Sequence, residues 1–248
     1  MRREIILGKD IIGKRVDVLD KGWIELVDLM PHPNTGIPGD LAIVNAARVS
    51  FMGESKGAES DKQLLFYLLR HRHTTPFEMV EFKFRVRAPL VTWWQWARHR
   101  TWNFNAQSGR YTPFEENDFY LPQVWRKQSQ DNKQASEGQL TDEQGAILDD
   151  KLVKHYAEGY RLYKEALDKG VAKELARLFL PGFSIYYTWV TKVDAHNLMH
   201  FIKLRMADEA QHEIRVYARV IYQHFFKNAL PWTAEAFERY ILNIDLDN

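Results

Sequence analysis

The sequence contains no cysteine in its 248 residues. This absence excludes disulfide bonds, thiolate metal sites and catalysis by a cysteine nucleophile. No apolar run is long enough to span a bilayer, and the first ten residues, MRREIILGKD, lack the apolar core of a signal peptide. We therefore expect a cytoplasmic protein with no membrane partner.

An excess of charge of either sign is also missing, since 34 Lys and Arg stand against 33 Asp and Glu. Overall charge therefore does not point to a strongly charged partner. Hydrophobic residues make up 45% of the chain, which is ordinary for a folded globular protein. At this length we expect one domain over residues 1–248, with a polar loop insert near 126–140 that is rich in Gln, Ser, Asp and Lys.

The hydrophobic pattern predicts a helix-rich α+β domain with an antiparallel or mixed sheet. Residues 80–86 (VEFKFRV) alternate apolar and charged side chains and predict a strand with one wet face. Thr141 and Gln144 form a capping-box pattern that opens a helix through about Ala166. The other predicted strands are 23–30 and 185–190. The other predicted helices are 40–49 with Asp40 as N-cap, 61–71, 89–97, 172–179, a long one over 194–226 that is either continuous or broken once, and one from Pro231. There is no GxGxxG pattern, so a Rossmann nucleotide site is not indicated.

Residues 82–114 contain no Asp or Glu, although the chain is nearly neutral overall. Arg98 and Arg100 follow residues 88–97, a predicted helix that is apolar almost all round and is expected to be buried. The helix macrodipole accounts for one cation at this end, but the missing carboxylates favour a phosphorylated ligand. The other cations of the segment are Lys83, Arg85, Arg87 and Arg110, and a solvated sheet face explains the first three equally well.

The next segment, residues 101–111 (TWNFNAQSGRY), is polar enough to bind a heterocyclic ring. Asn103, Asn105, Gln107 and Ser108 can hydrogen-bond a uracil or an isoalloxazine. Gly109 permits either close backbone approach or a positive φ. An ordinary polar loop would have the same composition, so the residues alone leave both interpretations open.

These residues resemble those of a known family. Arg98-His99-Arg100, then seven residues, then Ser108, is similar to the RHR-x7-S signature of the flavin-dependent thymidylate synthases. Further motifs in the family's order are His73-x-Thr75-Pro76-Phe77-Glu78, Gln95, Ser108-Gly109-Arg110-Tyr111, Ala176-Arg177, His200-Phe201-Ile202-x-Leu204-Arg205 and Ala210-Gln211-x-Glu213-Ile214, with weaker agreement at residues 46–50 and 231–232. The likeness covers most of the chain except residues 126–150.

The resemblance implies a homotetramer with the fold particular to these enzymes and with active sites shared between subunits. It implies that FAD is contacted by His73, Thr75, Glu78, Arg98, His99, Arg100, Asn105, His196 and His200. It implies that dUMP is held by Gln95, Arg98, Gln107, Ser108, Gly109, Arg110, Arg177 and Arg205. Arg205 is implied to be catalytic, because the family uses this residue to polarise the uracil ring near N3. Two positions depart from the family: Ala106 stands where Glu is usual, and Asp194 stands where Asn is common.

The chemistry agrees with this resemblance. Methylation of uracil requires C5 to become nucleophilic, and without a thiol the ring cannot be activated by a cysteine adding at C6. A guanidinium such as that of Arg205 can stabilise the anionic ring instead. Ser108 has no evident neighbouring base in the sequence, and we interpret it as a dUMP-binding hydroxyl. FAD reduced by NADPH would supply the hydride, and methylenetetrahydrofolate would supply the carbon.

Two other interpretations start from the same residues. His196 and His200, four apart on a predicted helix, could bind a metal together with residues such as His71, His73 and Glu78, although we predict no metal. The basic segment is also interleaved with Trp93, Trp94, Trp96, Trp102 and Phe104, which could stack nucleic-acid bases. The balanced overall charge argues against a nucleic-acid partner.

Overall fold

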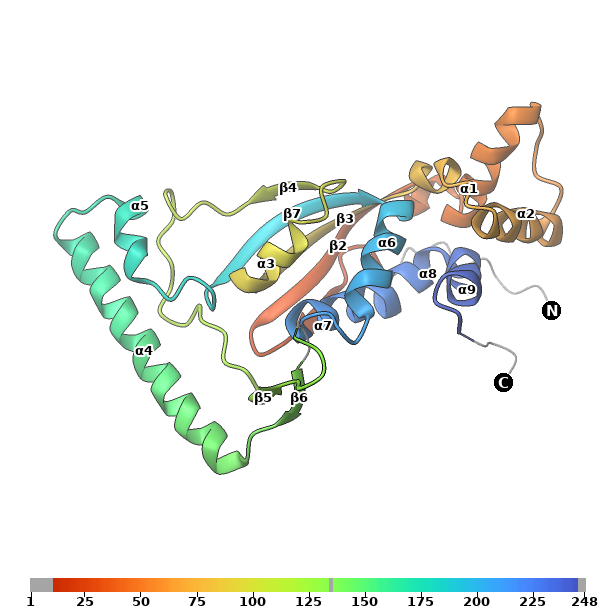
Figure 1. The fold of residues 1–248 in the computed structure, drawn as a ribbon. Coiled ribbons are helices and arrows are strands. Elements are labelled where there is room, and N and C mark those ends of the chain that lie inside the picture. Colours follow the sequence, from red (N-terminus) through yellow and green to blue (C-terminus); the bar gives the residue numbers. More distant parts are fainter. Residues whose placement is uncertain (1–10, 134–135, 245–248) are drawn as a thin grey trace.

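The computed structural model describes residues 11–133 and 136–244 (Figure 1). Its central sheet has five antiparallel strands, which confirms the predicted α+β class. The strand order is β1 (Arg15–Val18), β2 (Gly22–Met30), β3 (Glu81–Pro89), β7 (Tyr186–Asp194) and β4 (Asn103–Ala106). The alternation of β3 is clear, because Phe82, Phe84 and Val86 are fully buried while Lys83 on the opposite face is exposed. The strand predicted over 80–86 is thus confirmed.

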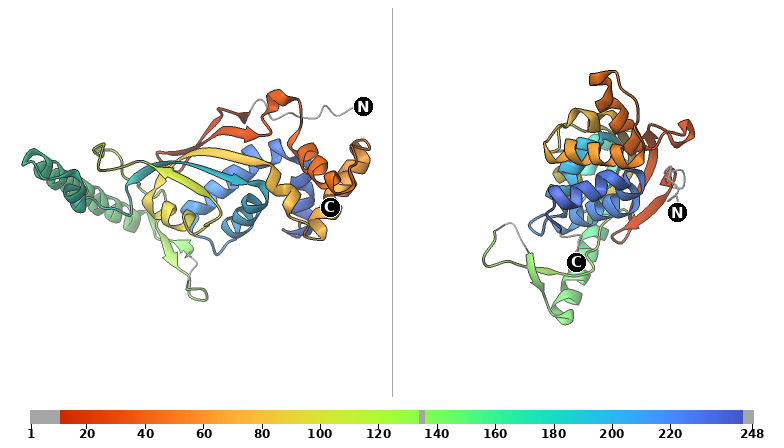
Figure 2. Two further views of the ribbon diagram at one scale, coloured as in Figure 1. Left: turned by 90° about the horizontal axis from the view of Figure 1, so that it is seen from above. Right: turned by 90° about the vertical axis from the view of Figure 1, so that its right-hand side faces the viewer.

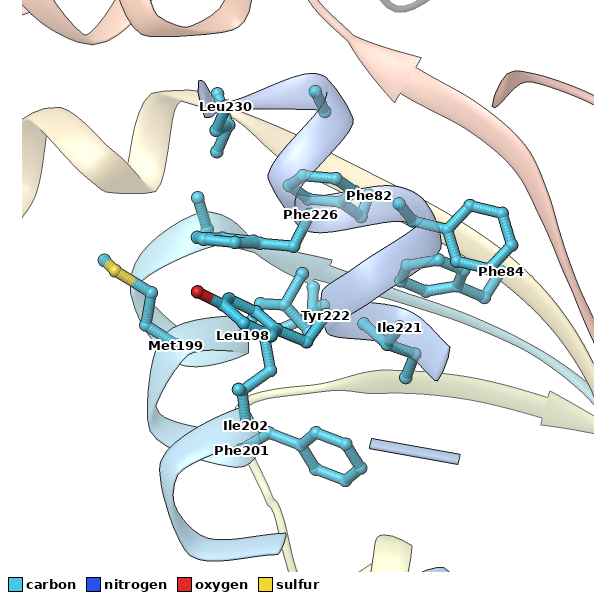
Figure 3. Close-up of a cluster of buried hydrophobic side chains, with 14 of the residues drawn as sticks. Phe82, Phe84, Leu198, Met199, Phe201, Ile202, Ile221, Tyr222, Phe226 and Leu230 are labelled. Carbon is cyan, nitrogen blue, oxygen red and sulfur yellow. The ribbon is translucent and has the colours of Figure 1, made fainter. Parts of the chain in front are cut away.

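Helices cover the apolar face of this sheet. They are α3 (Leu90–Trp96), α6 (Ala195–Met206), α7 (His212–Val220), the π-helical segment Ile221–Phe226 and α8 (Lys227–Ala229), while α9 (Pro231–Tyr240) follows α8 and packs against the helix Ala58–Arg70. Figure 3 shows Phe82 and Phe84 of β3 in one buried cluster with Phe226 and with residues of α6 such as Phe201 and Ile202, and the ring of Phe82 stacks on that of Phe226. The long helix predicted over 194–226 is broken, which is one of the two alternatives that the sequence left open. It is interrupted at residues 207–211 and changes to π-helical geometry at Ile221.

The remaining elements lie at the two ends of the sheet (Figures 1 and 2). At one end are α1 (Gly39–Arg48) and α2 (Ala58–Arg70), with 3-10 turns at Pro33–Thr35, Val49–Phe51 and Thr75–Met79. At the other end α4 (Asp142–Asp168) and α5 (Lys173–Ala176), followed by the 3-10 turn Arg177–Phe179, build a small second core around Tyr163. The capping box of Thr141 and Gln144 is present at the start of α4, as predicted.

The expected polar loop near 126–140 contains two short strands, β5 (Arg126–Gln128) and β6 (Ser136–Gln139), which pair antiparallel. Apart from the half-buried Arg126, the strand residues are exposed, in keeping with their polar composition. No helix within residues 11–133 and 136–244 combines the length and apolarity needed to cross a bilayer.

The sequence predicted Asp40 as the N-cap of α1, and this prediction is wrong. Pro38 takes that place, and Asp40 lies buried in the first turn. Its carboxylate accepts hydrogen bonds from the backbone nitrogens of Trp232 (2.8 Å) and Thr233 (3.0 Å) and from Thr233 Oγ1 (2.6 Å). Asp40 therefore caps α9, which is distant in sequence, and joins α1 to α9.

Candidate active site

A cavity of about 750 Å³ lies where the connection from α3 to β4 meets α6. The side chains that line it come from two short stretches of the described chain. They are Arg98, His99, Arg100 and Thr101 from the connection, and His196, Asn197, His200, Leu204 and Arg205 from α6. Six of the residues predicted to bind FAD or dUMP are thus brought together here.

Helix α6 orients its share of the cavity by amphipathic spacing. His196 and His200 are four residues apart and lie on one face of the helix, while Phe201 and Ile202 are fully buried in the main core. Asp194 is the N-cap of α6, since its carboxylate accepts from the backbone nitrogen of Asn197 at 2.9 Å and from its side-chain nitrogen at 2.7 Å. The departure at Asp194 therefore has a structural role at the start of this helix.

The Arg205 guanidinium is held at the cavity wall by two neighbours. Its Nε donates to His99 Nε2 at 2.9 Å, its Nη2 to the Gln95 carbonyl oxygen at 3.1 Å, and its Nη1 to Gln95 Oε1 at 3.4 Å. Burial, together with the nearby charge of Arg98, lowers the pKa of Arg205. Arginine nevertheless stays charged at neutral pH, because its ordinary pKa lies above about 12.

His99 is buried, with 8% of its surface exposed, and its ring centroid lies 4.9 Å from that of Phe201. Burial is the main cause that lowers the pKa of His99 to about 4, and the charges of Arg205 and His200 act in the same direction. His99 is therefore neutral at pH 7. Neutrality also agrees with the hydrogen bond, since Nε2 can accept from Arg205 only when it carries no proton.

The arginines of residues 82–114, the segment without Asp or Glu, differ in whether they have an acidic partner. On the sheet, Arg85 pairs with Glu25 at 2.9 Å and Arg87 with Asp118 at 2.5 Å, so their charges are neutralised within the chain. Within the described residues, by contrast, Arg98 and Arg100 have no carboxylate within 4.0 Å. The solvated-face interpretation thus fits the strand cations better, and the phosphate interpretation fits the cavity cations.

The helix preceding Arg98 is less buried than its composition predicted. Within α3 only Thr92 and Trp96 are buried, and Trp94 is 51% exposed with its ring 4.8 Å from that of the exposed Phe183. The expectation that this helix is buried is thus wrong for most of its residues in the single chain. An apolar face of this kind is more typical of a contact surface than of a solvated one.

A second group of predicted dUMP residues lies away from the cavity, beside α5. Lys173 Nζ donates to the Tyr111 carbonyl at 2.7 Å, and Arg110 pairs with Glu174 at 2.9 Å. Gln107 continues the pairing of β4 with β7 through its backbone bond to Thr188. With a strand rise of about 3.3 Å, Gln107 stands roughly 13 Å along the sheet from Asn103.

Gly109 in this second group allows close packing and does not adopt a positive φ. A Cβ at this position would lie 2.5 Å from the ring of Phe114, which is buried in the small core. The same Cβ position is 3.5 Å from Arg177 Nη1, so Arg177 belongs to this group. Ser108 Oγ accepts from the backbone nitrogen of Arg110 at 3.3 Å.

The other predicted contacts lie between or beyond these groups. Asn105 is exposed on β4, and Ala106 is half-buried opposite Trp189. His73, Thr75 and Glu78 are exposed around the 3-10 turn before β3, and they do not line the cavity. In the part of the chain that the structure describes, no three His, Asp or Glu side chains gather as a metal site would require.

Three cavity residues were not among the predicted contacts: Thr101, Asn197 and Leu204. In the sequence, only their positions next to Arg100, His196 and Arg205 could have indicated that they line the cavity. Leu204 even stood inside a matching motif without an assigned role.

The model of the Thy1 family, described as thymidylate synthase complementing protein, matches residues 26–232. The chain belongs to this family. It is 49% identical over 227 residues to a flavin-dependent thymidylate synthase of Thermus thermophilus, covering 92% of this chain and 79% of the relative. It is 44% identical over 228 residues to one of Dictyostelium discoideum, covering 91% and 74%. The predicted resemblance to flavin-dependent thymidylate synthases is thus confirmed.

A solved structure supports the same placement. The crystal structure of the UMP/dUMP methylase PolB from Streptomyces cacaoi, bound with 5-Br dUMP, superposes with a TM-score of 0.78 at 31% identity. The similarity covers 91% of this chain and 98% of that chain. A dependence on flavin and a methyl-transferring chemistry therefore agree with the family, the relatives and the fold.

Proposed function

We propose that the protein is an FAD-dependent thymidylate synthase that converts dUMP to dTMP, with methylenetetrahydrofolate as carbon donor and NADPH as reductant. The observation that carries the proposal is the cavity in which Arg98, Arg100 and Arg205 converge without a carboxylate among the described residues. Two phosphorylated ligands, a flavin dinucleotide and a nucleoside monophosphate, need such uncompensated cations. The family and the named relatives support the same activity.

The residues present fit a bound FAD. Arg98 and Arg100 offer guanidinium donors of the kind that match phosphate oxygens, and His196 and His200 face the same cavity from α6. We propose that these four residues, together with His73, Thr75, Glu78 and Asn105 around them, hold the cofactor. FAD reduced by NADPH would supply the hydride that completes the methyl group.

The residues of the chain would activate the uracil ring without a thiol. We propose that Arg205, which is cationic and fixed, stabilises the negative charge that builds on the ring as C5 attacks the methylene carbon. Gln95 and Arg98 would hold dUMP from the cavity side. Gln107, Ser108, Gly109, Arg110 and Arg177 would hold it from the second group.

The separation of these two groups supports a homotetramer with shared active sites. In one chain the second group lies beside α5 and contributes no residue to the cavity lining. Leu178 (77%), the residue after Arg177, is a large exposed apolar side chain, and the contacting pair Phe183 (60%) and Trp94 (51%) forms another exposed apolar face. We propose that these faces pack against other subunits and bring the second group of one chain to the cavity of another.

The decisive experiment is anaerobic conversion of dUMP to dTMP by the purified protein with FAD, NADPH and methylenetetrahydrofolate. We expect a yellow protein, which therefore carries flavin, and dTMP formation that needs both NADPH and methylenetetrahydrofolate. A parallel assay with UMP in place of dUMP shows whether the protein accepts ribose as well as deoxyribose in its substrate. A colourless protein that takes up no FAD, forms no dTMP and retains oligonucleotides would instead support a nucleic-acid-binding role. The cytoplasmic location expected from the sequence stays a prediction.

A further inference from the structure

The anchoring of Arg205 uses neutral groups only. The acceptors are the imidazole of His99, the side-chain oxygen of Gln95 and the backbone oxygen of Gln95. Among the described residues no Asp or Glu lies within 4.0 Å of Arg205, whereas buried or half-buried guanidiniums elsewhere, such as those of Arg48 and Arg126, have carboxylate partners at 2.5 and 2.6 Å. Arg205 is thus oriented without being neutralised.

The difference matters for a charge that has to act on a ligand. A carboxylate at hydrogen-bonding distance would cancel most of the field of the guanidinium at the substrate. A neutral acceptor fixes the same geometry and leaves the positive charge undiminished. Three of the five N–H bonds of Arg205 are engaged by His99 and Gln95, so two remain at the wall of the cavity.

His99 can play this part only as a neutral ring whose Nε2 is unprotonated. Its surroundings enforce that state, since it is 8% exposed, packs on Phe201 and lies beside two groups that repel a proton, Arg205 and His200. The sequence also presents His99 between two arginines, Arg98 and Arg100, which places further positive charge next to it.

We propose that His99 is a positioning residue of the methylation reaction: it accepts a hydrogen bond from Arg205 Nε and thereby aims an uncompensated guanidinium at the uracil ring. This inference rests on the proposed function. It assigns His99 a role through Arg205, different from the flavin contact that the family resemblance implied.

The two roles make different predictions for the holoenzyme. The test compares His99→Gln, whose side-chain oxygen can reach the position of Nε2, with His99→Leu, which offers no acceptor. A third variant, His99→Asn, carries an amide too short to reach that position. His155→Leu, on the exposed face of α4, is the control for loss of a histidine.

We expect kcat for dTMP formation to fall on the order of 100-fold in His99→Leu and His99→Asn, with FAD content unchanged. His99→Gln should stay within about tenfold of the parent, because the acceptor is restored. In an Arg205→Ala background, His99→Leu should cause no further loss, since the group that it positions is gone. If His99→Leu does not fold, the comparison of Gln with Asn decides the matter.

Equal kcat in all three variants would overturn the inference, and so would a loss of the same size in the Arg205→Ala background. Loss of FAD from the Leu and Asn variants in proportion to activity would return His99 to the role of flavin ligand. If the parent protein itself forms no dTMP, the proposed function is wrong. If the parent is active and the variants give any of these results, only the positioning role of His99 is wrong.

Discussion

At the scale of the residue, the site is built from charges that the chain leaves uncompensated. Residues 82–114 supply Arg85 and Arg87, which are paired with Glu25 and Asp118. They also supply Arg98 and Arg100, which have no carboxylate partner in the part of the chain that the structure describes. Composition could indicate that cations gather in this segment. It could not indicate which of them meet acids, because Glu25 and Asp118 approach only when the strands and loops are in place.

Replacing Arg205 with Ala should abolish most turnover while the protein keeps its flavin. Losing a charge that acts on the developing anion costs roughly 10²–10³-fold in kcat. Steady-state dTMP formation and the FAD absorbance of the purified variant measure the two effects separately. Full methylation activity in this variant would remove Arg205 from the mechanism.

Replacing Gly109 with Ala should destabilise the loop that carries Ser108. The added Cβ would meet the Phe114 ring at 2.5 Å, and this ring is fixed in the small core. Overpacking of this kind costs about 1–3 kcal/mol, and we expect a lower Tm together with a higher KM for dUMP. Gly182→Ala is the matched control, because nothing lies within 4 Å of its Cβ position. Equal effects of the two substitutions would contradict the packing argument.

At the scale of the element, Asp40 connects α1 with the start of α9. Burial is the main cause that raises the pKa of Asp40 from 3.8 to about 6, although hydrogen bonds from Thr233 and Trp232 oppose it. The folded state therefore binds a proton more tightly than the unfolded state does. The contribution of protonated Asp40 to the free energy of unfolding is complete below about pH 4. It is lost as the pH rises through 6, and the loss is on the order of 3 kcal/mol.

Replacing Asp40 with Asn should remove this contribution to the pH dependence. Asn keeps an acceptor oxygen for the start of α9 but does not ionise between pH 4 and 7. The Tm of the variant relative to the parent should thus rise between pH 4 and 6, and thermal unfolding across that range measures it. Asp17→Asn, at an exposed position in β1, serves as the control. Parallel pH profiles for the parent and the Asp40 variant would refute the assignment.

The elements also show what a sequence can predict. Period-two alternation marked β3 because one face of the strand is buried along its whole length. Residues 207–211, where the long helix is interrupted, contain no Pro or Gly to mark the position of the break. Asp40 has the local pattern of an N-cap for α1 but caps α9. Both depend on packing between distant segments, which local pattern does not record.

At the scale of the whole molecule, the motifs were found in the right order but not in one place. The Arg98 to Arg100 group and Arg205 converge through the contact of α6 with the connection after α3. Ser108, Arg110 and Arg177 gather beside α5, and Gln107 is held in the sheet opposite Thr188. A sequence motif that spans both groups indicates one binding site, but only an assembly of several chains can complete it under our proposal.

Mixing two inactive variants tests this arrangement. Arg205→Ala damages the cavity and Arg177→Ala damages the second group, so each protein alone should lack activity. If every site combines the two groups from different chains, random mixing leaves roughly a quarter of the sites intact in both. Activity should then return when the two proteins are unfolded and refolded together, but not when each is refolded alone. Two different affinity tags, one on each variant, verify that mixed oligomers have formed. If these mixed oligomers stay inactive, one chain supplies both groups and the exposed apolar faces serve another purpose.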